Sequence, residues 1–298
     1  MSSQPIVTVL LAVYNDARFL PLAVQSVLLQ TFEHFDFVVI NDGSTDDSGE
    51  YLAQLHDPRL RIFHNDSNLG LAASLNRGLD LSRGGYIARM DADDICEPDR
   101  LRRQVEFLDA NSQVGVLGSS RKLIDEEGKP VAIAAAVRTD LAIRWKCLLG
   151  NPFAHPTVML RRSVLDEHRL RYALYQRAQD YEFWTRVLLY TQGANLPDAL
   201  VQYRLRGGDR RAGKAMQLAN HDRIAHAACS RLLPQFPLTV EQVRNLRGRY
   251  GGFSVREPEM DPQEAPWLDL YRQMFEEFME SRLHGAKREP GHSRSTIA

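Results

Sequence analysis

Three carboxylates stand close together at Asp91, Asp93 and Asp94, directly after the mostly apolar segment 86–90. Like charges at such spacing repel, so each raises the cost of ionising the others. A hard divalent cation relieves that repulsion, and Mg²⁺ is usually held by one or two carboxylates together with substrate phosphates. The stretch therefore predicts a site for a metal-bound diphosphate at the end of a strand. A solvated acidic turn before the helix that begins near Pro98 is the alternative explanation.

The elements that must position these carboxylates follow from hydrophobic patterns in the first 90 residues. Nearly continuous apolar runs at Ile6–Val13 and Phe35–Ile40 are typical of strands buried on both faces of a parallel sheet. A further strand is expected at Leu60–His64, and apolar residues at helical spacing follow the strands at 18–30, 51–55 and 71–81. This alternation of strand and helix predicts βαβ units and an α/β fold with a mostly parallel sheet.

Polar clusters follow three of these predicted strands, at residues 14–16, 41–44 and 91–94. In open α/β sheets, ligands bind beyond the carboxyl ends of the strands. We therefore expect the three clusters to lie on one rim of the sheet, which favours a ligand site there over an isolated acidic turn.

Later segments predict further elements and a change in organisation. Strands are expected at 114–119 and 157–160, an exposed hairpin turn at 125–128, and helices from Pro98, at 140–149 and at 180–190. Strand patterns then cease, which predicts a catalytic domain over 1–210 and a helical C-terminal region over 211–283. The polar, Gly- and Pro-containing residues 284–298 are expected to be a disordered tail.

Composition excludes several classes of protein. The 298 residues carry a net charge of -1, which disfavours nucleic acid as a partner. Three cysteines, Cys96, Cys147 and Cys229, lack C-x-x-C spacing and fit a reducing cytosol better than a disulfide framework or a zinc site. Neither a signal peptide nor an apolar run of membrane-spanning length is visible. We expect a cytoplasmic protein, with peripheral contact at the inner face of the cell membrane left open.

An ordered set of motifs is more specific than any one of them. The set comprises Val13-Tyr14-Asn15, Val39-Ile40-Asn41-Asp42-Gly43-Ser44-Thr45-Asp46, Asn68-Leu69-Gly70 with Asn76-Arg77-Gly78, Met90-Asp91-Ala92-Asp93-Asp94, Ala154-His155-Pro156-Thr157-Val158-Met159 and Gln179-Asp180-Tyr181-Glu182-Phe183-Trp184. Over residues 5–206 the chain resembles the family 2 glycosyltransferases of bacterial surface polysaccharide assembly. The resemblance implies a GT-A, Rossmann-like fold, with its mostly parallel sheet flanked by helices and followed here by the C-terminal helical segment.

The resemblance also implies roles for residues at the nucleotide end of the site. Asp91 and Asp93 match the family's D-x-D pair, so Asp93 would bind Mn²⁺ or Mg²⁺ and Asp91 would contact the ribose or the metal shell. Val13, Tyr14 and Asp42 match nucleotide-binding positions, with Tyr14 packing on the base and Asp42 accepting a hydrogen bond from it. An ordinary Asp-Gly turn and a packing tyrosine are the structural alternatives.

Asp180 matches the position of the family's catalytic base. Inverting transfer needs one carboxylate to accept the proton of the acceptor hydroxyl, and a free Asp with a pKa near ~3.9 is a weak base. The alternative is an N-cap for the helix that follows. Glu182 ranks second as the base, and Trp184 is expected in the core.

Two further residues carry open alternatives. His155 stands just before a predicted strand and is expected to line the acceptor or diphosphate pocket, and a structural histidine is nearly as well supported. Asp94 assists the metal or caps the following helix, and the cap is slightly favoured.

One segment departs from the family pattern. Members often carry Tyr-Arg-x-His near the end of the catalytic domain, whereas this chain has Tyr203-Arg204-Leu205-Arg206. A guanidinium does not ligate metals but grips phosphate bidentately, so Arg206 is expected to contact a diphosphate directly. The substitution also weakens the expectation of metal dependence. Arg210 and Arg211 extend a basic patch or lie on solvated surface.

The sequence thus predicts an inverting, metal-dependent glycosyltransferase of the hexosyl or a related type, using a UDP- or dTDP-sugar. Its acceptor would be a glycan or lipid-linked saccharide in polysaccharide, lipopolysaccharide or other cell-envelope synthesis. A sugar-nucleotide nucleotidyltransferase is an alternative, although residues 14–18 lack the glycine-rich loop of such enzymes. A catalytically silent sugar-nucleotide-binding assembly subunit is another. The amphipathic stretch 267–283 favours packing or self-association as a homodimer over binding to anionic lipid.

Overall fold

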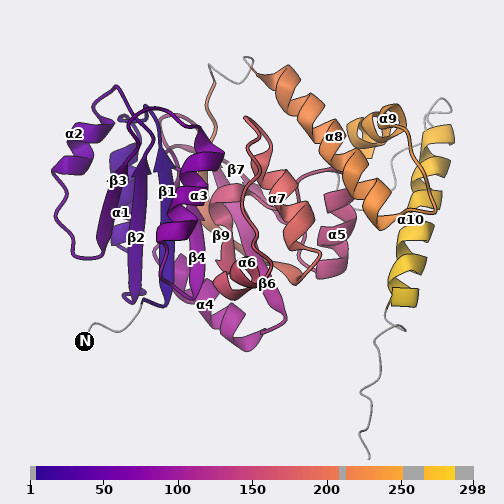
Figure 1. Ribbon diagram of the computed structural model, residues 1–298, viewed down its shortest axis with the longest axis horizontal. Coiled ribbons are helices and arrows are strands. Elements are labelled where there is room, and N and C mark those ends of the chain that lie inside the picture. Colours follow the sequence, from indigo (N-terminus) through magenta and orange to yellow (C-terminus); the bar gives the residue numbers. More distant parts are fainter. Residues whose placement is uncertain (1–4, 208–212, 251–264, 286–298) are drawn as a thin grey trace, which may run out of the picture. The chain divides into compact units, whose positions relative to one another are not determined.

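The computed structural model describes residues 5–207, 213–250 and 265–285 (Figure 1). Within them a nine-stranded sheet has the order β3-β2-β1-β4-β8-β6-β9-β5, and β7 pairs with β6 outside this path. The strands are β1 (Val7–Val13), β2 (Phe35–Asn41), β3 (Leu60–His64), β4 (Tyr86–Met90), β5 (Ile95–Cys96), β6 (Val114–Ile124), β7 (Pro130–Ala134), β8 (Met159–Arg161) and β9 (Gln192–Arg204).

The first four strands of that order are all parallel. In their register Val13 lies beside Asn41 and Leu11 beside Met90, so β1, β2 and β4 end at the same edge. The polar segments that follow these strands therefore start from one rim. The expected α/β fold and the strands at this end of the sheet are confirmed.

Helices flank the sheet (Figure 1). They are α1 (Leu20–Leu28), α2 (Ser48–Ala53), α3 (Leu71–Leu81), α4 (Arg100–Ala110), α5 (Asp140–Leu149), α6 (Arg162–Glu167) and α7 (Gln179–Val187). The later part of the chain forms α8 (Lys214–Leu232), α9 (Val240–Tyr250) and α10 (Ala265–Gly285). Helix α3 packs on β1 and β2 through apolar residues at helical spacing. Gly78 permits the close approach, because a Cβ there would stand 2.1 Å from Leu10 Cδ1.

The other half of the sheet is mixed. Strand β8 is antiparallel to both β4 and β6, and β9 runs parallel to β6 with several register shifts. The predicted hairpin turn is confirmed, since β6 and β7 pair antiparallel across residues 125–128. The strand expected at 157–160 begins later, because a 3-10 turn occupies His155–Thr157. Strand β9 was not predicted, and it carries the chain back to the rim.

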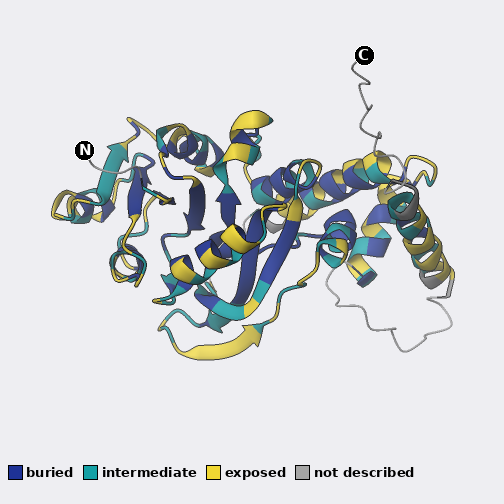
Figure 2. Ribbon diagram, turned by 90° about the horizontal axis from the view of Figure 1, so that it is seen from below, coloured by how far each residue is buried: buried dark blue, intermediate teal, exposed yellow. Residues whose placement is uncertain are grey.

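The strands at the centre of the sheet are buried (Figure 2). All residues of β1, β2 and β4 are buried, as expected for strands covered on both faces. Trp184 of α7 is fully buried, which confirms its expected place in the core.

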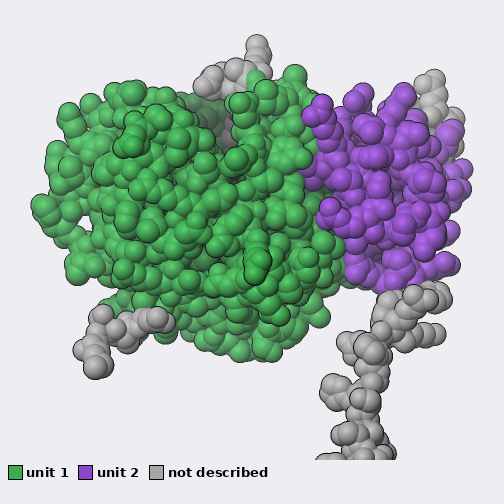
Figure 3. Space-filling view, viewed as in Figure 1, with its two compact units in different colours: residues 1–147, 151–221 green, residues 148–150, 222–298 purple. Residues whose placement is uncertain are grey.

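The chain divides into two compact units, shown in separate colours in Figure 3. One comprises residues 1–147 and 151–221, and the other comprises residues 148–150 and 222–298. All the predicted site residues, from Val13 to Arg206, belong to the first unit. The boundaries at 210 and 283 stay predictions, and residues 286–298 of the expected tail lie outside the described residues.

In the second unit α9 and α10 pack together, with Leu246, Met274 and Phe278 buried. Helix α10 confirms the amphipathic helix expected at 267–283. None of the helices that the structure describes is long and apolar enough to cross a membrane.

Candidate active site

Asp91 follows β4 directly and pairs with an arginine from the same strand. Arg89 is only 2% exposed, and its Nη2 donates to Asp91 Oδ1 over 2.5 Å. The Nε and Nη1 of Arg89 find no hydrogen-bond partner among the described residues. A buried cation with a single carboxylate partner is costly to leave unpaired, so the ion pair holds Asp91 in place.

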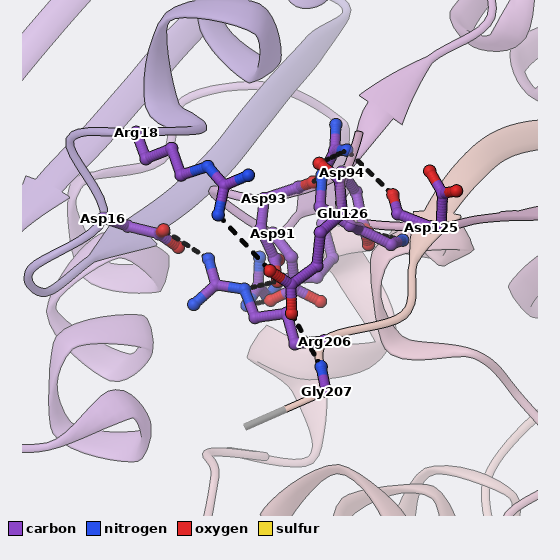
Figure 4. Close-up of polar contacts among 11 residues, drawn as sticks. Asp16, Arg18, Asp91, Asp93, Asp94, Asp125, Glu126, Arg206 and Gly207 are labelled. Carbon is purple, nitrogen blue, oxygen red and sulfur yellow. Dashed lines mark hydrogen bonds and ion pairs between the residues drawn. The ribbon is translucent and has the colours of Figure 1, made fainter. Parts of the chain in front are cut away.

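Asp93 faces the second arginine of the site (Figure 4). Arg206 Nε forms an ion pair with Asp93 Oδ2 at 2.7 Å. Burial and the charge of Asp91 nevertheless raise the pKa of Asp93 to about 6, against the opposing charge of Arg206. One guanidinium therefore leaves the negative charge at this edge only partly compensated.

Asp94 is buried and joins the end of β4 to β9. Its Oδ1 accepts a hydrogen bond from the backbone N–H of Arg204 at 2.8 Å, whereas Oδ2 has no partner in the described part of the chain. Burial and the charges of Asp91 and Asp93 raise its pKa well above the ordinary value. The favoured helix-cap role is wrong, because β5 intervenes and Asp99 stands at the start of α4.

Arg206 also contacts the segment after β1. Its Nη2 donates to Asp16, and its guanidinium lies 4.8 Å from the centre of the Phe19 ring. Arg18 and Arg204 stack on the same ring at 4.7 Å and 4.6 Å. Burial raises the pKa of Asp16, although Arg206 opposes this. Sequence reasoning did not assign Asp16 or Phe19, whose partner Arg206 lies about 190 positions away.

The hairpin between β6 and β7 adds a carboxylate to the same surface (Figure 4). Glu126 accepts hydrogen bonds from the backbone N–H of Gly207 and from Arg18. Arg204 donates to the carbonyl oxygens of Asp125 and Glu126. The hairpin turn therefore fixes the chain that leads to Arg206.

Asp42 is buried at the end of β2 and organises a loop. Its carboxylate accepts from Asn65 Nδ2 at 2.6 Å and from the backbone N–H groups of Leu69 and Gly70 at 2.9 Å. Gly43 has a φ of +69°, and a Cβ there would stand 2.5 Å from the backbone of Ser67. The 65–70 loop thus lies directly against the segment that follows β2.

Val13 and Tyr14 stand beside Asp42 at the rim. The carbonyl of Val13 accepts from the N–H of Asp42 at 2.8 Å. Val13 is buried, whereas Tyr14 is 47% exposed and so is free to cover a ligand. The structure brings these three residues together, and their nucleotide-binding role stays a prediction.

Asp180 lies in the first turn of α7. The helix begins at Gln179 after Ala178, which has a left-handed φ of +65°, so the N-cap alternative for Asp180 is wrong. Asn151 Nδ2 donates to Asp180 Oδ2 at 2.6 Å. Burial raises the pKa of Asp180 against three stabilising hydrogen bonds, and the charge of Asp91 raises it further. The carboxyl is therefore a stronger base than a free Asp and lies within electrostatic reach of Asp91.

Glu182 is occupied elsewhere. Both of its oxygens accept from Arg186, at 2.6 Å and 2.7 Å. This bidentate guanidinium partner occupies both oxygens of Glu182. This arrangement supports Asp180 over Glu182 as the base.

His155 is buried beneath the rim. Its Nε2 shares a 3.0 Å hydrogen bond with the Tyr172 hydroxyl, and its ring packs edge-on against Trp184. Burial and the charge of Arg89 lower the pKa of His155 well below its usual value, so the ring is neutral. These contacts favour the structural alternative, and a contact with diphosphate or acceptor stays a prediction.

The donor set at the rim suits a metal ion that arrives with a substrate. Among the described residues, no three His, Cys, Asp or Glu side chains are grouped to hold an ion by themselves. Asp91 and Asp93 each keep one carboxylate oxygen outside the ion pairs with Arg89 and Arg206. Because Mg²⁺ commonly uses one or two carboxylates plus phosphate oxygens, the pair fits such an ion. Arg210 and Arg211 lie outside the described residues.

The sequence model of the family described as "Glycosyl transferase family 2" matches residues 8–169, more than half of the chain. The chain therefore belongs to this family. An uncharacterized glycosyltransferase of Haemophilus influenzae is 35% identical over 70% of this chain and 68% of its own length. The putative glycosyltransferase EpsE of Bacillus subtilis is 33% identical, over 68% and 74%. The amylovoran biosynthesis glycosyltransferase AmsE of Erwinia amylovora is 30% identical, over 66% and 75%.

Solved structures share the fold at low sequence identity. S. aureus TarS 1-349 in complex with UDP-GlcNAc superposes with a TM-score of 0.64 at 17% identity, covering 98% of this chain and 94% of the other. The mannosyltransferase PcManGT of Pyrobaculum calidifontis, in complex with GDP-Man and Mn2+, gives a TM-score of 0.56 at 17% identity, covering 97% and 77%. These likenesses confirm the glycosyltransferase GT-A fold.

Proposed function

We propose that the protein is an inverting glycosyltransferase that moves a hexosyl or related sugar from a nucleoside-diphosphate sugar, of the UDP or dTDP type, to an acceptor hydroxyl. The observation that carries the proposal is that one compact unit holds carboxylates in two different surroundings. Asp91 and Asp93 stand beside arginines at the rim, whereas the Asp180 side chain faces the neutral amide of Asn151, and burial raises its pKa. The first setting suits a diphosphate, and the second suits a base.

The nucleotide end of the donor would lie on the rim. Tyr14 would cover the base beside Val13, Asp42 would accept a hydrogen bond from the base, and Asp91 would contact the ribose. Asp42 already accepts from Asn65, Leu69 and Gly70, so it also holds the loop that borders the base. The bound sugar nucleotides of TarS and PcManGT support a donor of this class.

The diphosphate would lie against Asp93 and Arg206. Asp93 and Asp91 are the residues that would hold Mn²⁺ or Mg²⁺, and the Mn2+ in PcManGT supports such an ion. A bound divalent ion supplies Lewis-acid stabilisation of the charge that develops on the departing diphosphate. Arg206 adds a guanidinium whose fork matches phosphate oxygens. His155 lies beneath this region, and its role would be structural, through its hydrogen bond to Tyr172 and its ring contact with Trp184.

The acceptor end would be governed by Asp180. Its carboxylate takes the proton of the acceptor hydroxyl while that oxygen attacks the anomeric carbon on the face opposite the nucleoside diphosphate. The carbon–oxygen bond to the diphosphate breaks, and the electron pair leaves with the diphosphate. A raised pKa brings the base closer to the operating pH, where proton transfer is most effective.

A glycan or lipid-linked saccharide in polysaccharide synthesis is the proposed acceptor. The relative AmsE is named for amylovoran biosynthesis, which supports this class. Assembly at the inner face of the membrane, peripheral or as a homodimer, stays a prediction for this chain.

A donor panel tests the proposal. The protein would be incubated with UDP-, dTDP- and GDP-sugars, with and without Mn²⁺, and slow donor hydrolysis and thermal stabilisation would be measured. We expect one nucleotide class to give both responses in the wild type, and stabilisation without hydrolysis in Asp180→Asn. Stabilisation without hydrolysis in the wild type would favour the silent assembly subunit. Release of diphosphate from a nucleoside triphosphate and a sugar phosphate would favour a nucleotidyltransferase. No response to any sugar nucleotide would contradict the proposal.

A further inference from the structure

Arg206 joins two carboxylates that come from distant parts of the chain. It stands two residues after β9, donates a hydrogen bond to Asp16, which follows β1, and forms an ion pair with Asp93, which follows β4. The guanidinium is stacked on Phe19, and the Arg206 side chain is 37% exposed. The cation is therefore held by three partners at the surface of the rim and not sealed in the core.

The position of this cation affects any second cation at the same place. Arg206 Nε lies 2.7 Å from Asp93 Oδ2, one of the oxygens that a metal ion at Asp93 would use or approach. Two cations that share one carboxylate repel each other, and partial burial strengthens the repulsion. Asp93 can therefore bind a metal ion tightly only when Arg206 has another anion as its partner.

A diphosphate provides that anion. Its oxygens match the fork of a guanidinium, and they are also the remaining ligands that Mg²⁺ or Mn²⁺ prefers. Asp16 keeps Arg206 at the rim during such an exchange, because it bonds Nη2 and leaves Nε to change partner. Asp16 is in this sense a positioning residue that acts through Arg206.

We propose that the Arg206 guanidinium is a built-in cation of the diphosphate site. It pairs with Asp93 in the free protein and moves onto the diphosphate when the nucleotide binds. Divalent metal and nucleoside diphosphate then bind cooperatively, and the free protein holds the metal weakly. This inference rests on the proposed function for the identity of the diphosphate. Its metal-only prediction rests on the ion pair alone.

Arg18 provides a matched control. It stacks on the same Phe19 ring at nearly the same distance, 4.7 Å against 4.8 Å for Arg206. It pairs instead with Glu126 and Glu127 on the hairpin. Arg18→Gln therefore removes one positive charge and one stacked guanidinium from the same surface, and it leaves the Arg206–Asp93 pair in place.

The experiment titrates the full chain with Mn²⁺ and measures binding by calorimetry and by the electron paramagnetic resonance signal of free Mn²⁺. The titration is made without nucleotide and again with saturating UDP, dTDP or GDP. In the wild type, we expect the nucleotide that binds to raise Mn²⁺ affinity at least tenfold. In Arg206→Gln, we expect Mn²⁺ alone to bind about tenfold more tightly and the coupling to nucleotide to shrink. Reciprocity requires the same loss of coupling when nucleotide is titrated at fixed Mn²⁺.

Three comparisons decide the outcome. Arg18→Gln should keep wild-type Mn²⁺ affinity, and Arg206→Lys, which keeps a cation, should keep it weak. Arg206→Met, which preserves the apolar contact with Phe19, repeats the test if the glutamine variant does not fold. The inference is overturned if Arg206→Gln binds Mn²⁺ no more tightly than the wild type, or if Arg18→Gln gains as much affinity. Failure of every nucleotide to bind would contradict the proposed function, while the Mn²⁺-only comparison would still decide the role of Arg206.

Discussion

The site has carboxylates in two settings, at the end of β4 and at the start of α7. At β4, Asp91 and Asp93 each face an arginine, Arg89 and Arg206. At α7, Asp180 faces the neutral amide of Asn151. Both regions lie in the same compact unit, and burial raises the pKa of both Asp93 and Asp180.

The difference between the two regions lies in charge compensation. A carboxylate beside a guanidinium is stabilised in its ionised form, which is the form that binds cations and orients a diphosphate. Asp93 nevertheless has a pKa raised to about 6, so the two regions differ in the partner of the carboxylate, a guanidinium at the rim and an amide at α7, and not in which carboxylate binds a proton more readily. The comparison supports the proposal that the end of β4 binds the diphosphate and that Asp180 accepts the proton.

The largest expected effect comes from Asp180→Asn. The variant keeps the shape of the side chain and an oxygen for Asn151 but loses the basic site. Loss of a general base should lower transferase turnover by about 10²–10⁴-fold, with nucleotide affinity nearly unchanged. Single-turnover transfer and nucleotide titration measure the two quantities separately.

Glu182→Gln is the matched control for that variant, because Glu182 lies on the same helix and is occupied by Arg186. It should retain turnover within a few-fold of the wild type. Full activity in Asp180→Asn, or a larger loss in Glu182→Gln, would break the comparison.

Asp91→Asn tests the paired side of the comparison through stability. It leaves the buried Arg89 without its carboxylate, and breaking a fully buried pair costs roughly 3–5 kcal/mol. Because Asp91 is itself partly exposed, we expect a smaller loss of about 2 kcal/mol in the free energy of unfolding. Urea unfolding measures it.

A double variant supplies the control for this prediction. Asp91→Asn with Arg89→Met removes the unpaired charge and should recover part of the lost stability. If Asp91→Asn alone is as stable as the wild type, Arg89 does not depend on Asp91 and the pairing argument is wrong.

Asp42→Asn tests whether a rim carboxylate also holds structure. An amide nitrogen would replace one of the two oxygens that accept from Asn65, Leu69 and Gly70. Leaving one of these donors unsatisfied should cost about 1–3 kcal/mol and weaken nucleotide binding. Asp47→Asn, at an exposed position whose side chain makes no cap hydrogen bond, should change stability by less than about 0.5 kcal/mol. Equal effects of the two variants would contradict the assignment.

The smallest expected effect is a pH-dependent gain of stability in Asp180→Asn. Because the folded-state pKa of Asp180 is raised, the wild type binds its proton more readily when folded and loses stability as pH rises through that pKa. The Asn variant has no such loss, so it should be more stable than the wild type at neutral pH. The difference should vanish below the unfolded pKa of about 3.9. Thermal unfolding at several pH values would show it, and a destabilised variant at neutral pH would contradict it.

The sequence predicts those parts of the fold that depend on local patterns. Buried parallel strands appear as continuous apolar runs, so β1, β2 and the rim where they end could be predicted. Strand β9 could not, because its 13 residues mix buried and exposed positions and include Pro197 and Asp198. Its pairing with β6 also shifts register, which removes any simple alternation.

The candidate site divides in the same way. Asp42, Asp91 and Asp180 stand in recognisable motifs, and the structure places all three in one unit. The contact between Asp16 and Arg206 joins residues about 190 positions apart, so no local sequence pattern could predict it. The sequence slightly favours a helix cap for Asp94 over a role at the metal, because the two-residue strand β5 is too short to give a hydrophobic signal.

The measurement that tests the central claim most directly is the anomeric configuration of the product. A donor with an α-linked sugar would be incubated with the wild type and its acceptor, and the new linkage would be assigned by proton NMR. Direct displacement with Asp180 as the single base predicts a β-linked product. An α-linked product would contradict the account, because retention requires a different chemical path from the one that these carboxylates support.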